Sequence, residues 1–157
     1  MSDEWFDVMS VDGRFLATVR WRSPGTLCGP SFGGLELQNA RLSNLKLDGA
    51  SFCDAILEGA VFDGSMLSTA LFQSANLVRA SFVGVDLRMA FLDDAILAGA
   101  DLRGADLRDA CLTRADLRGC KLEGARLGGA RFDGETRFDI GVCPMRLGMH
   151  VQLERWT

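Results

Sequence analysis

The chain contains no tyrosine, and its only histidine is His150. A tyrosine general acid is therefore unavailable, and a site built from several histidines is excluded. No run of 18 apolar residues occurs, so the sequence predicts no membrane-spanning helix. The five cysteines are odd in number, widely spaced and without a Cys-x-x-Cys pair. This pattern argues against a disulfide framework and against a zinc site, and it fits a reducing compartment.

An excess of basic residues is also missing, because 17 Lys and Arg stand against 21 Asp and Glu. The formal net charge of -4 argues against direct binding of nucleic acid through a basic face. The N-terminus is acidic and lacks the apolar core of a signal peptide. With 157 residues, 48% of them hydrophobic and 24% charged, the composition is that of one globular domain. We therefore expect a cytoplasmic protein without membrane contact.

The dominant feature that is present is a five-residue repeat. From Phe32 to Phe132, every fifth residue is Leu or Phe, at 21 successive positions with no insertion. We name these residues the centres. The residue two before a centre is Ala in 15 of the 21 repeats, and 11 glycines lie two residues after a centre. The cleanest copies are residues 100–104 and 115–119, each with the sequence Ala-Asp-Leu-Arg-Gly.

A period of five fits neither an α-helix nor a flat strand. A helix of 3.6 residues per turn would spread the centres around its axis, and a strand would turn successive centres to opposite faces. The pattern works if each repeat is a short extended piece followed by a corner, with the Ala and the centre pointing inward. Gly is favoured at the corner because it tolerates unusual backbone angles. The sequence thus predicts an all-β coil whose turns stack through backbone hydrogen bonds.

The Ala-(Asp/Asn)-Leu-x-x pattern of residues 30–134 resembles that of the pentapeptide repeat protein family. The resemblance implies a right-handed quadrilateral β-helix with four repeats per coil, and therefore about five coils in residues 31–139. Residues 132–138 are similar to a common last-coil terminus of this family. There the register slips by one residue, since Phe138 stands one position after the expected centre.

Both ends of the chain lack the repeat. Residues 1–30 predict an N-terminal β-hairpin cap, because Asp12-Gly13 between two apolar runs is typical of a tight hairpin turn. Residues 140–157 are expected to be a C-terminal cap or dimerisation segment. Apolar and polar residues alternate over 145–153, which favours a strand, and a short helix is the alternative.

A lone strand at the C-terminus would leave backbone groups unpaired, so it needs a partner. It could fold back over the last coil, or pair with a second copy across a two-fold axis. The resemblance favours the second arrangement, because members of the family dimerise through C-terminal segments. We therefore expect a homodimer with Met145, Met149, Leu153 and Trp156 at the contact.

No motif in the sequence predicts catalysis. There is no Gly-rich phosphate loop, and nothing places a serine, an aspartate and His150 together. Asp93-Asp94 falls at a corner, where side chains are normally solvated. Cys53 and Cys111 fall at outward positions, but no neighbouring base is predicted. We expect a protein that is not an enzyme and that has no cofactor and no metal.

Four repeats per coil would place residues 20 apart directly above one another. On that spacing Leu71, Phe91 and Cys111 form an apolar strip at outward positions, and Ile56 and Ile96 extend it on the neighbouring side. Such a strip is a candidate contact for a protein partner of unknown identity. The alternative is that these aliphatic side chains have no binding role and only support pairing between coils.

Two functions follow. The first is a non-enzymatic protein-interaction or scaffold protein that acts through the faces of a β-helical rod. The second is implied by the resemblance, since some members mimic duplex DNA, bind bacterial DNA gyrase or topoisomerase IV, and protect these enzymes from quinolones or toxins. The repeat region has 16 acidic and 12 basic residues. They are interleaved, as Asp101 with Arg103, which is typical of a solvated surface rather than of continuous acidic rows.

Overall fold

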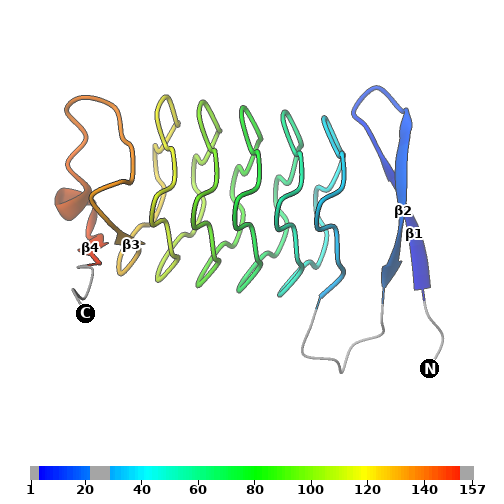
Figure 1. The fold of residues 1–157 in the computed structure, drawn as a ribbon, viewed down its shortest axis with the longest axis horizontal. Coiled ribbons are helices and arrows are strands. Elements are labelled where there is room, and N and C mark those ends of the chain that lie inside the picture. Colours follow the sequence, from blue (N-terminus) through cyan, green and yellow to red (C-terminus); the bar gives the residue numbers. More distant parts are fainter. Residues whose placement is uncertain (1–3, 22–28, 153–157) are drawn as a thin grey trace.

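The computed structural model describes residues 4–21 and 29–152. The chain forms a rod in which successive coils lie side by side, with a hairpin at one end and two short strands at the other (Figure 1). Within the described ranges, no helix is long and apolar enough to cross a membrane.

Each coil has four sides, and each side pairs with the residue 20 positions later. Phe91 forms a parallel bridge with Cys111, and Ile96 does so with Asp116. The N–H of Leu97 donates to the carbonyl of Asp116 (2.8 Å), while the N–H of Asp116 donates to the carbonyl of Ala95 (3.0 Å). Four five-residue sides therefore close one coil, and the predicted quadrilateral β-helix is confirmed.

The corners are tight turns with a left-handed residue. The N–H of Ala100 donates to the carbonyl of Leu97 (2.8 Å), and Gly99 between them has a φ of 72°. A positive φ at the third of four residues is the geometry of a type II turn, which explains the preference for Gly two residues after a centre. Ten corners carry another residue at this position with a positive φ: Asn39, Asn44, Asp54, Thr69, Ser74, Arg79, Met89, Asp94, Asp109 and Arg114.

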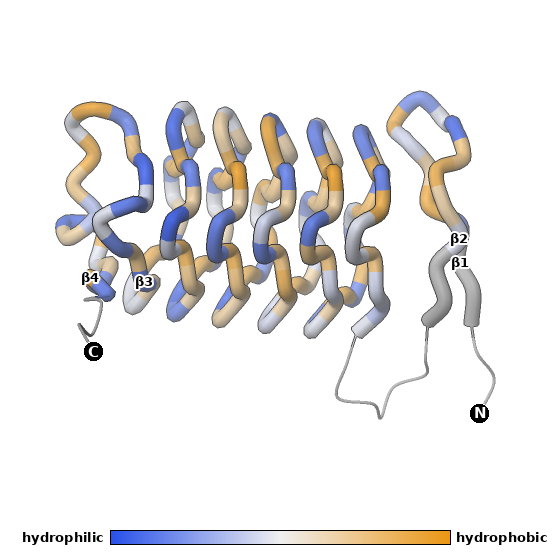
Figure 2. Tube along the Cα trace, in the orientation of Figure 1, coloured by the Kyte–Doolittle hydropathy of each residue, from blue (hydrophilic) through white to orange (hydrophobic). Residues whose placement is uncertain are grey.

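The centres fill the interior of the rod. Every centre from Phe32 to Leu117 is buried, and Figure 2 shows the matching alternation of hydrophobic and hydrophilic residues along each coil. Phenylalanine rings stack between coils, with centroids 4.5 Å apart for Phe32 and Phe52 and 4.8 Å apart for Phe62 and Phe82. The two stacks meet edge to face, which is a favourable aromatic arrangement. The outward residues are thus held on a rigid, close-packed frame.

An antiparallel hairpin covers the N-terminal end. Strand β1 (Glu4–Met9) pairs with β2 (Phe15–Trp21) around the Asp12-Gly13 turn. The hairpin joins the first coil through the N–H of Arg41, which donates to the carbonyl of Met9 (2.7 Å). Val8 is buried against the core, so the hairpin acts as a cap.

Over the described part of residues 145–153, the structure has the short helix that was the alternative, and the favoured strand is confined to two residues. Pro144–Leu147 form a short 3-10 helix (η1), and only β4 (His150–Val151) is extended, pairing in parallel with β3 (Arg131–Phe132). Pro144 pre-sets the φ of a helix start, and Gly148 ends the helix in the left-handed conformation with a φ of 78°. These two residues override the alternation of hydrophobicity. The segment that follows the helix folds back on its own last coil.

The predicted slip in register is present. Asp116 bridges to Arg137, 21 positions later instead of 20. The side chain of Asp133 takes up the extra residue, because its Oδ1 accepts the N–H groups of Arg114 (3.0 Å), Glu135 (3.1 Å) and Thr136 (2.9 Å). In a regular coil the N–H of the corner residue meets a backbone carbonyl, as Asp94 meets Thr113 (3.0 Å).

Candidate interaction surface

The four sides of the rod present four outward columns, which are named here after their members in the coil 91–110. The Phe91 side carries Ser31, Ser51, Leu71, Phe91, Cys111 and Arg131, and the Ile96 side carries Glu36, Ile56, Asn76, Ile96, Asp116 and Arg137. The Asp101 side carries Arg41, Val61, Ser81, Asp101 and Lys121, and the Asp106 side carries Lys46, Met66, Asp86, Asp106 and Arg126.

Most of the predicted apolar strip points outward. The Phe91 side chain is 38% exposed and Ile96 is 44% exposed, whereas Leu71 and Ile56 are half-buried. Phe91 and Ile96 therefore present two exposed apolar side chains on adjacent sides of one coil. The half-buried Leu71 and Ile56 lie on the same two sides in preceding coils.

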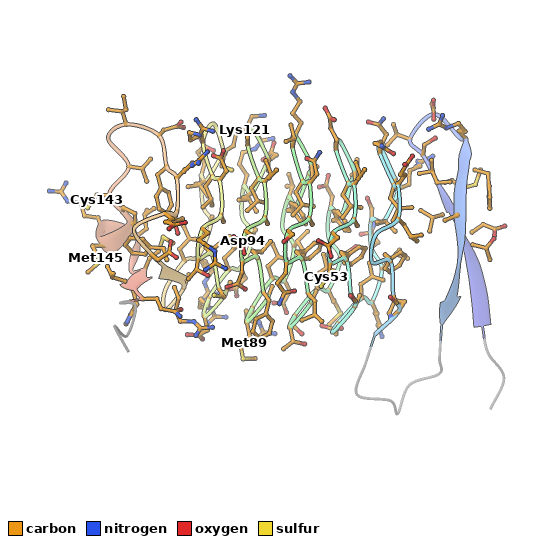
Figure 3. The ribbon with its side chains drawn as sticks, viewed as in Figure 1. Cys53, Met89, Asp94, Lys121, Cys143 and Met145 are labelled. Carbon is orange, nitrogen blue, oxygen red and sulfur yellow. The ribbon has the colours of Figure 1, made fainter. Side chains whose placement is uncertain are left out.

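Met89 extends this surface around the next corner. It lies two residues before Phe91, is exposed, and projects from the lower rim of the rod in Figure 3. The sequence analysis did not include Met89 in the candidate face. The signal was available, because Met89 occupies a corner position with a φ of 56° where most repeats have Gly or a polar residue. We define the apolar surface as Met89, Phe91 and Ile96 with Leu71 and Ile56.

Cys111 does not belong to the exposed strip, although its position in the column is the predicted one. It is only 5% exposed, since its Sγ donates to Asp93 Oδ1 (2.8 Å) and lies 3.6 Å from Thr113 Oγ1. Thr113 donates to the same carboxylate oxygen (2.5 Å). Burial, together with the hydrogen bond to Asp93, raises the pKa of the Cys111 thiol. The expectation that Cys111 contributes an exposed apolar group to the strip is therefore wrong.

The corner between the Phe91 and Ile96 sides is polar. Arg114 donates two hydrogen bonds to Asp94 (2.7 and 2.6 Å), which hold the pKa of this carboxyl below its usual value. Further along the same corner, Cys53 Sγ donates to Gln73 Oε1 (3.2 Å). Figure 3 shows Cys53 and Asp94 at mid-height of the rod. Any partner of the apolar surface would thus meet an ion pair and hydrogen-bonding groups between the two apolar sides.

Four of the acidic outward residues are neutralised locally. Asp86, Asp101, Asp106 and Asp116 each pair with the arginine two positions later, at N–O distances of 2.6–2.7 Å. These hydrogen bonds lower the pKa of all four carboxyls. Lys121 and Arg126 add weaker contacts to Asp101 (3.3 Å) and Asp106 (3.5 Å) of the preceding coil. The charged sides therefore alternate in sign over short distances.

The described part of the chain contains no group of three or more His, Cys, Asp or Glu side chains that could hold a metal ion. A shallow hollow at the C-terminal end is lined by Met145, Met149, His150 and Val151. His150 is the one titratable group among these lining residues, and it lies in β4 at the surface.

The residues predicted at a dimer contact differ in their exposure. Met145 is 61% exposed at the C-terminal end, close to Cys143 in Figure 3. Met149 is only 2% exposed and packs into the core of its own chain, because it follows the turn at Gly148 and faces the last coil. Met149 is thus not available at a surface contact. Leu153 and Trp156 lie outside the described residues.

The family of the chain follows from its sequence. Eight copies of the family model for pentapeptide repeats match residues 36–73, 75–114 and 110–134, which is more than half of the chain. The chain therefore belongs to the pentapeptide repeat family, and its rod is the right-handed quadrilateral β-helix of that family. No curated protein matches the chain significantly.

Several solved structures are similar. A pentapeptide repeat protein of the Arabidopsis thaliana thylakoid lumen is 33% identical over 59% of this chain and 68% of that one, with a TM-score of 0.50. One from Nostoc PCC 7120 is 34% identical over 78% and 84% of the two chains, with a TM-score of 0.44. One from Cyanothece 51142 is 28% identical over 76% and 78%, with a TM-score of 0.43.

Proposed function

We propose that this chain is a non-enzymatic interaction or scaffold protein that binds a protein partner through the apolar surface. The supporting observation is the exposure of Met89, Phe91 and Ile96 within eight residues of the chain. Other repeats carry polar residues or glycine at most of these positions. Large apolar side chains gathered on an exposed surface are a mark of protein contacts.

The frame beneath this surface favours binding. Leu92 and Leu97, the centres next to Phe91 and Ile96, are fully buried, and the backbone is paired to coils on both sides. The apolar side chains are therefore presented on a backbone that need not be ordered when the partner binds. A pre-organised surface loses less conformational entropy on association. An exposed phenylalanine on such a frame is suited to anchor a contact.

The variant Phe91→Asp tests the proposal. Partners are captured with the tagged full chain from a bacterial lysate, and the affinity of each purified partner is then measured by calorimetry. Because Phe91 points outward, the variant should lose less than about 1 kcal/mol of stability. Loss of a central aromatic anchor should cost at least about 2 kcal/mol of binding, or roughly thirtyfold in Kd.

Met66→Asp is the matched control. Met66 is also apolar and exposed at an outward position, but on the Asp106 side. This variant should bind the partner as the unmodified chain does. If Phe91→Asp keeps full affinity, or if both variants weaken binding equally, the partner does not use the apolar surface.

The alternative function is DNA mimicry toward a bacterial type II topoisomerase, gyrase or topoisomerase IV, with protection from quinolones or toxins. A mimic needs rows of uncompensated negative charge, and the arginine partners of Asp86, Asp101, Asp106 and Asp116 work against this. Titration of purified gyrase at roughly 50 and 300 mM salt separates the two functions. A mimic should lose most of its affinity at the higher salt, whereas an apolar contact should change little.

We further propose that the protein acts in the cytoplasm as a homodimer. Exposed Met145, Leu147 and Val151 at the C-terminal end support this oligomeric state, because apolar side chains of this size are commonly covered by a partner. The masses of the full chain and of a variant at this end provide the test.

A further inference from the structure

The C-terminal edge of the β-helix is paired on only two of its four sides. On the Phe91 side, the N–H of His150 donates to the carbonyl of Ala130 (2.7 Å). On the Ile96 side, the N–H of Arg137 donates to the carbonyl of Ala115 (2.9 Å). At the next corner the carboxylate of Asp139 accepts the N–H of Gly119 (2.9 Å) and takes the place of a strand. The Asp101 side has no such closure, and the Asp106 side is closed only at its corner, where the N–H of Gly129 donates to the carbonyl of Gly148 (2.9 Å).

The unpaired backbone groups on the Asp101 side are identified by comparison with the preceding coil. There, the N–H groups of Leu102 and Gly104 donate to the carbonyls of Lys121 (2.9 Å) and Glu123 (3.0 Å). One coil later the equivalent donors are the N–H groups of Leu122 and Gly124, and the equivalent acceptor is the carbonyl of Cys120. None of these three groups has a hydrogen-bond partner among the residues that the structure describes.

The same holds on the Asp106 side. The N–H of Leu127 and the carbonyl of Ala125 are unpaired within the described ranges, although Leu107 and Ala105 make the corresponding bonds to Arg126 one coil earlier. The two sides together present donors and acceptors at the spacing of a parallel strand. This is an open sheet edge at the C-terminal end of the rod.

The segment between Asp139 and Gly148 passes the Asp101 side without pairing to it, and it reaches the Asp106 side only at Gly148, whose carbonyl accepts the N–H of Gly129 (2.9 Å). Its 3-10 helix η1 uses an internal bond, from the N–H of Arg146 to the carbonyl of Cys143 (3.0 Å). Figure 1 shows the segment displaced from the last coil along the rod. The inward residues Cys120, Leu122 and Ala125 are only partly buried, whereas their counterparts one coil earlier are fully buried. The core is therefore incompletely covered at the open edge.

We propose that this open edge binds an extended, acidic segment of a partner protein, which adds to the β-helix as a parallel strand. Strand addition uses main-chain hydrogen bonds for affinity and side-chain positions for specificity. Inward, the segment needs an apolar residue over Leu122 with a small residue two positions before it. This is the pattern that most repeats of the chain follow.

Charge selects the outward residue of the segment. Lys121 and Arg126 end their columns with exposed side chains, and each contacts an acid of the preceding coil, Asp101 at 3.3 Å and Asp106 at 3.5 Å. Opposite charges stack favourably between neighbouring strands, so the next position in both columns favours Asp or Glu. The segment thus has a small, an acidic and an apolar residue in this order. Lys121 projects at the upper rim of the rod in Figure 3, where it can contact the acidic residue.

The probe is a ten-residue peptide, Gly-Ala-Asp-Leu-Ser-Gly-Ala-Asp-Leu-Ser, added to the full chain and followed by amide hydrogen exchange with NMR detection. Without peptide, the amides of Leu122, Gly124 and Leu127 should exchange rapidly, while that of Leu102 is protected. With peptide on the order of 1 mM, the first three should become protected. Rapid exchange that persists with peptide, or protection before peptide is added, would overturn the proposal.

N-methylated peptides give the matched control. In a parallel strand the N–H of the Asp faces the Cys120 carbonyl and the N–H of the following Leu faces away. Methylation of the Asp amide should weaken binding roughly tenfold, and methylation of the Leu amide should leave it unchanged. Equal effects of the two methyl groups would show that no strand is added.

Charge is tested with Lys121→Gln, which should weaken peptide binding about two- to fivefold. Lys46→Gln is the control, because Lys46 is exposed at the opposite end of the rod, and it should have no effect. An unchanged affinity in Lys121→Gln contradicts the choice of an acidic segment. The amides of Leu122 and Gly124 could instead become protected as the protein concentration rises, without peptide. That result would show that a second copy of the chain occupies the edge, and it would overturn the proposal of a partner segment. Phe91→Asp should bind the peptide normally, so this test is independent of the apolar surface.

Discussion

At the scale of single residues, the corners constrain the sequence most strongly. Each needs a positive φ two residues after a centre, and Gly meets this need without strain. Thr69 has a φ of 57°, which is unfavourable for a β-branched residue, and its Oγ1 bonds only to the neighbouring carbonyl of Ser68 (2.6 Å). The repeat thus tolerates local strain where its stacked neighbours fix the backbone.

Thr69→Gly should therefore stabilise the protein. It removes a strain of about 1–3 kcal/mol and adds about 0.5–1 kcal/mol of chain entropy to the unfolded state, for a net gain of about 1 kcal/mol. Thermal unfolding followed by circular dichroism should show a higher Tm. Gly84→Thr is the reverse control: a Cβ at Gly84 would meet nothing within 4 Å, so its cost reports the φ of 66° alone. A Tm lowered by Thr69→Gly would contradict the strain argument.

Inward positions that are not Ala show a second rule at this scale. Ser65 donates its hydroxyl to the carbonyl of Leu42 (2.6 Å), and Cys120 uses its Sγ in the same way toward Leu97 (3.1 Å). Both acceptors are centres 23 positions earlier in the chain. Burial raises the pKa of Cys120 to about 12, so its thiol stays protonated. A small polar side chain is accepted inside the rod at these two positions because a carbonyl lies within hydrogen-bonding distance.

At the scale of elements, the slip in the last coil depends on one side chain. Asp133→Ala would leave the N–H groups of Arg114, Glu135 and Thr136 without their acceptor, and it should cost about 2–4 kcal/mol. Urea unfolding at pH 7 measures this loss. Asp94→Asn is the control, since Asn tolerates the positive φ of this corner and the variant removes only an exposed ion pair, so its loss should be below about 1 kcal/mol. Equal losses would mean that Asp133 does not hold the slip.

The elements that a repeat or a turn motif defines were predictable. The centres predicted the buried core, Asp12-Gly13 predicted the hairpin, and the displaced Phe138 predicted the slip in register. The alternation over 145–153 favours a strand, but Pro144 and Gly148 determine the local backbone and give a short 3-10 helix. Alternation over so short a segment does not decide between a strand and a tight helix.

For the apolar surface, the sequence predicted only which residues occupy the outward columns. Spacing placed Phe91 and Ile96 outward, but Cys111 is covered by contacts of its Sγ with Asp93, 18 positions away, and with Thr113. Such contacts depend on side-chain length and rotamer, which a single repeat does not reveal. The open edge beyond Lys121 and Arg126 was equally hidden. It exists because the chain leaves the coil after Asp139, and that departure follows from the irregular C-terminal segment.

At the scale of the whole molecule, the Asp–Arg pairs predict a loss of stability in acid. Hydrogen bonds from arginine hold the pKa values of Asp86, Asp101, Asp106 and Asp116 below the unfolded value near 3.9. Their contribution is complete above about pH 4, where the carboxyls are ionised in both states, and it is lost as the pH falls through the folded pKa values. The Tm should thus be flat from neutral pH to about pH 4 and fall below it.

Asp101→Asn provides the control for this dependence. The variant lacks one of the four carboxyls, so its Tm should be slightly lower at pH 7 and should fall less steeply in acid. Each contribution is small because the pairs are open to solvent, and added salt should reduce it further. A Tm that rises on acidification would contradict the assignment of stabilising pairs.

We expect the C-terminal end of the rod to determine the oligomeric state. β4 and Met149 are committed to the last coil of their own chain, so a dimer must use the side chains that remain exposed, Met145 and Val151 among them. We expect the full chain at tens of micromolar to have about twice its mass of 17.0 kDa by light scattering. Met145→Asp should convert it to a monomer with an unchanged Tm, since Met145 lies outside the core. Removal of residues 144–157 should instead lower the Tm, because it strips Met149 and β4 from the last coil. A mass of 17.0 kDa for the unmodified chain would contradict the dimer and leave this end as an intrachain cap.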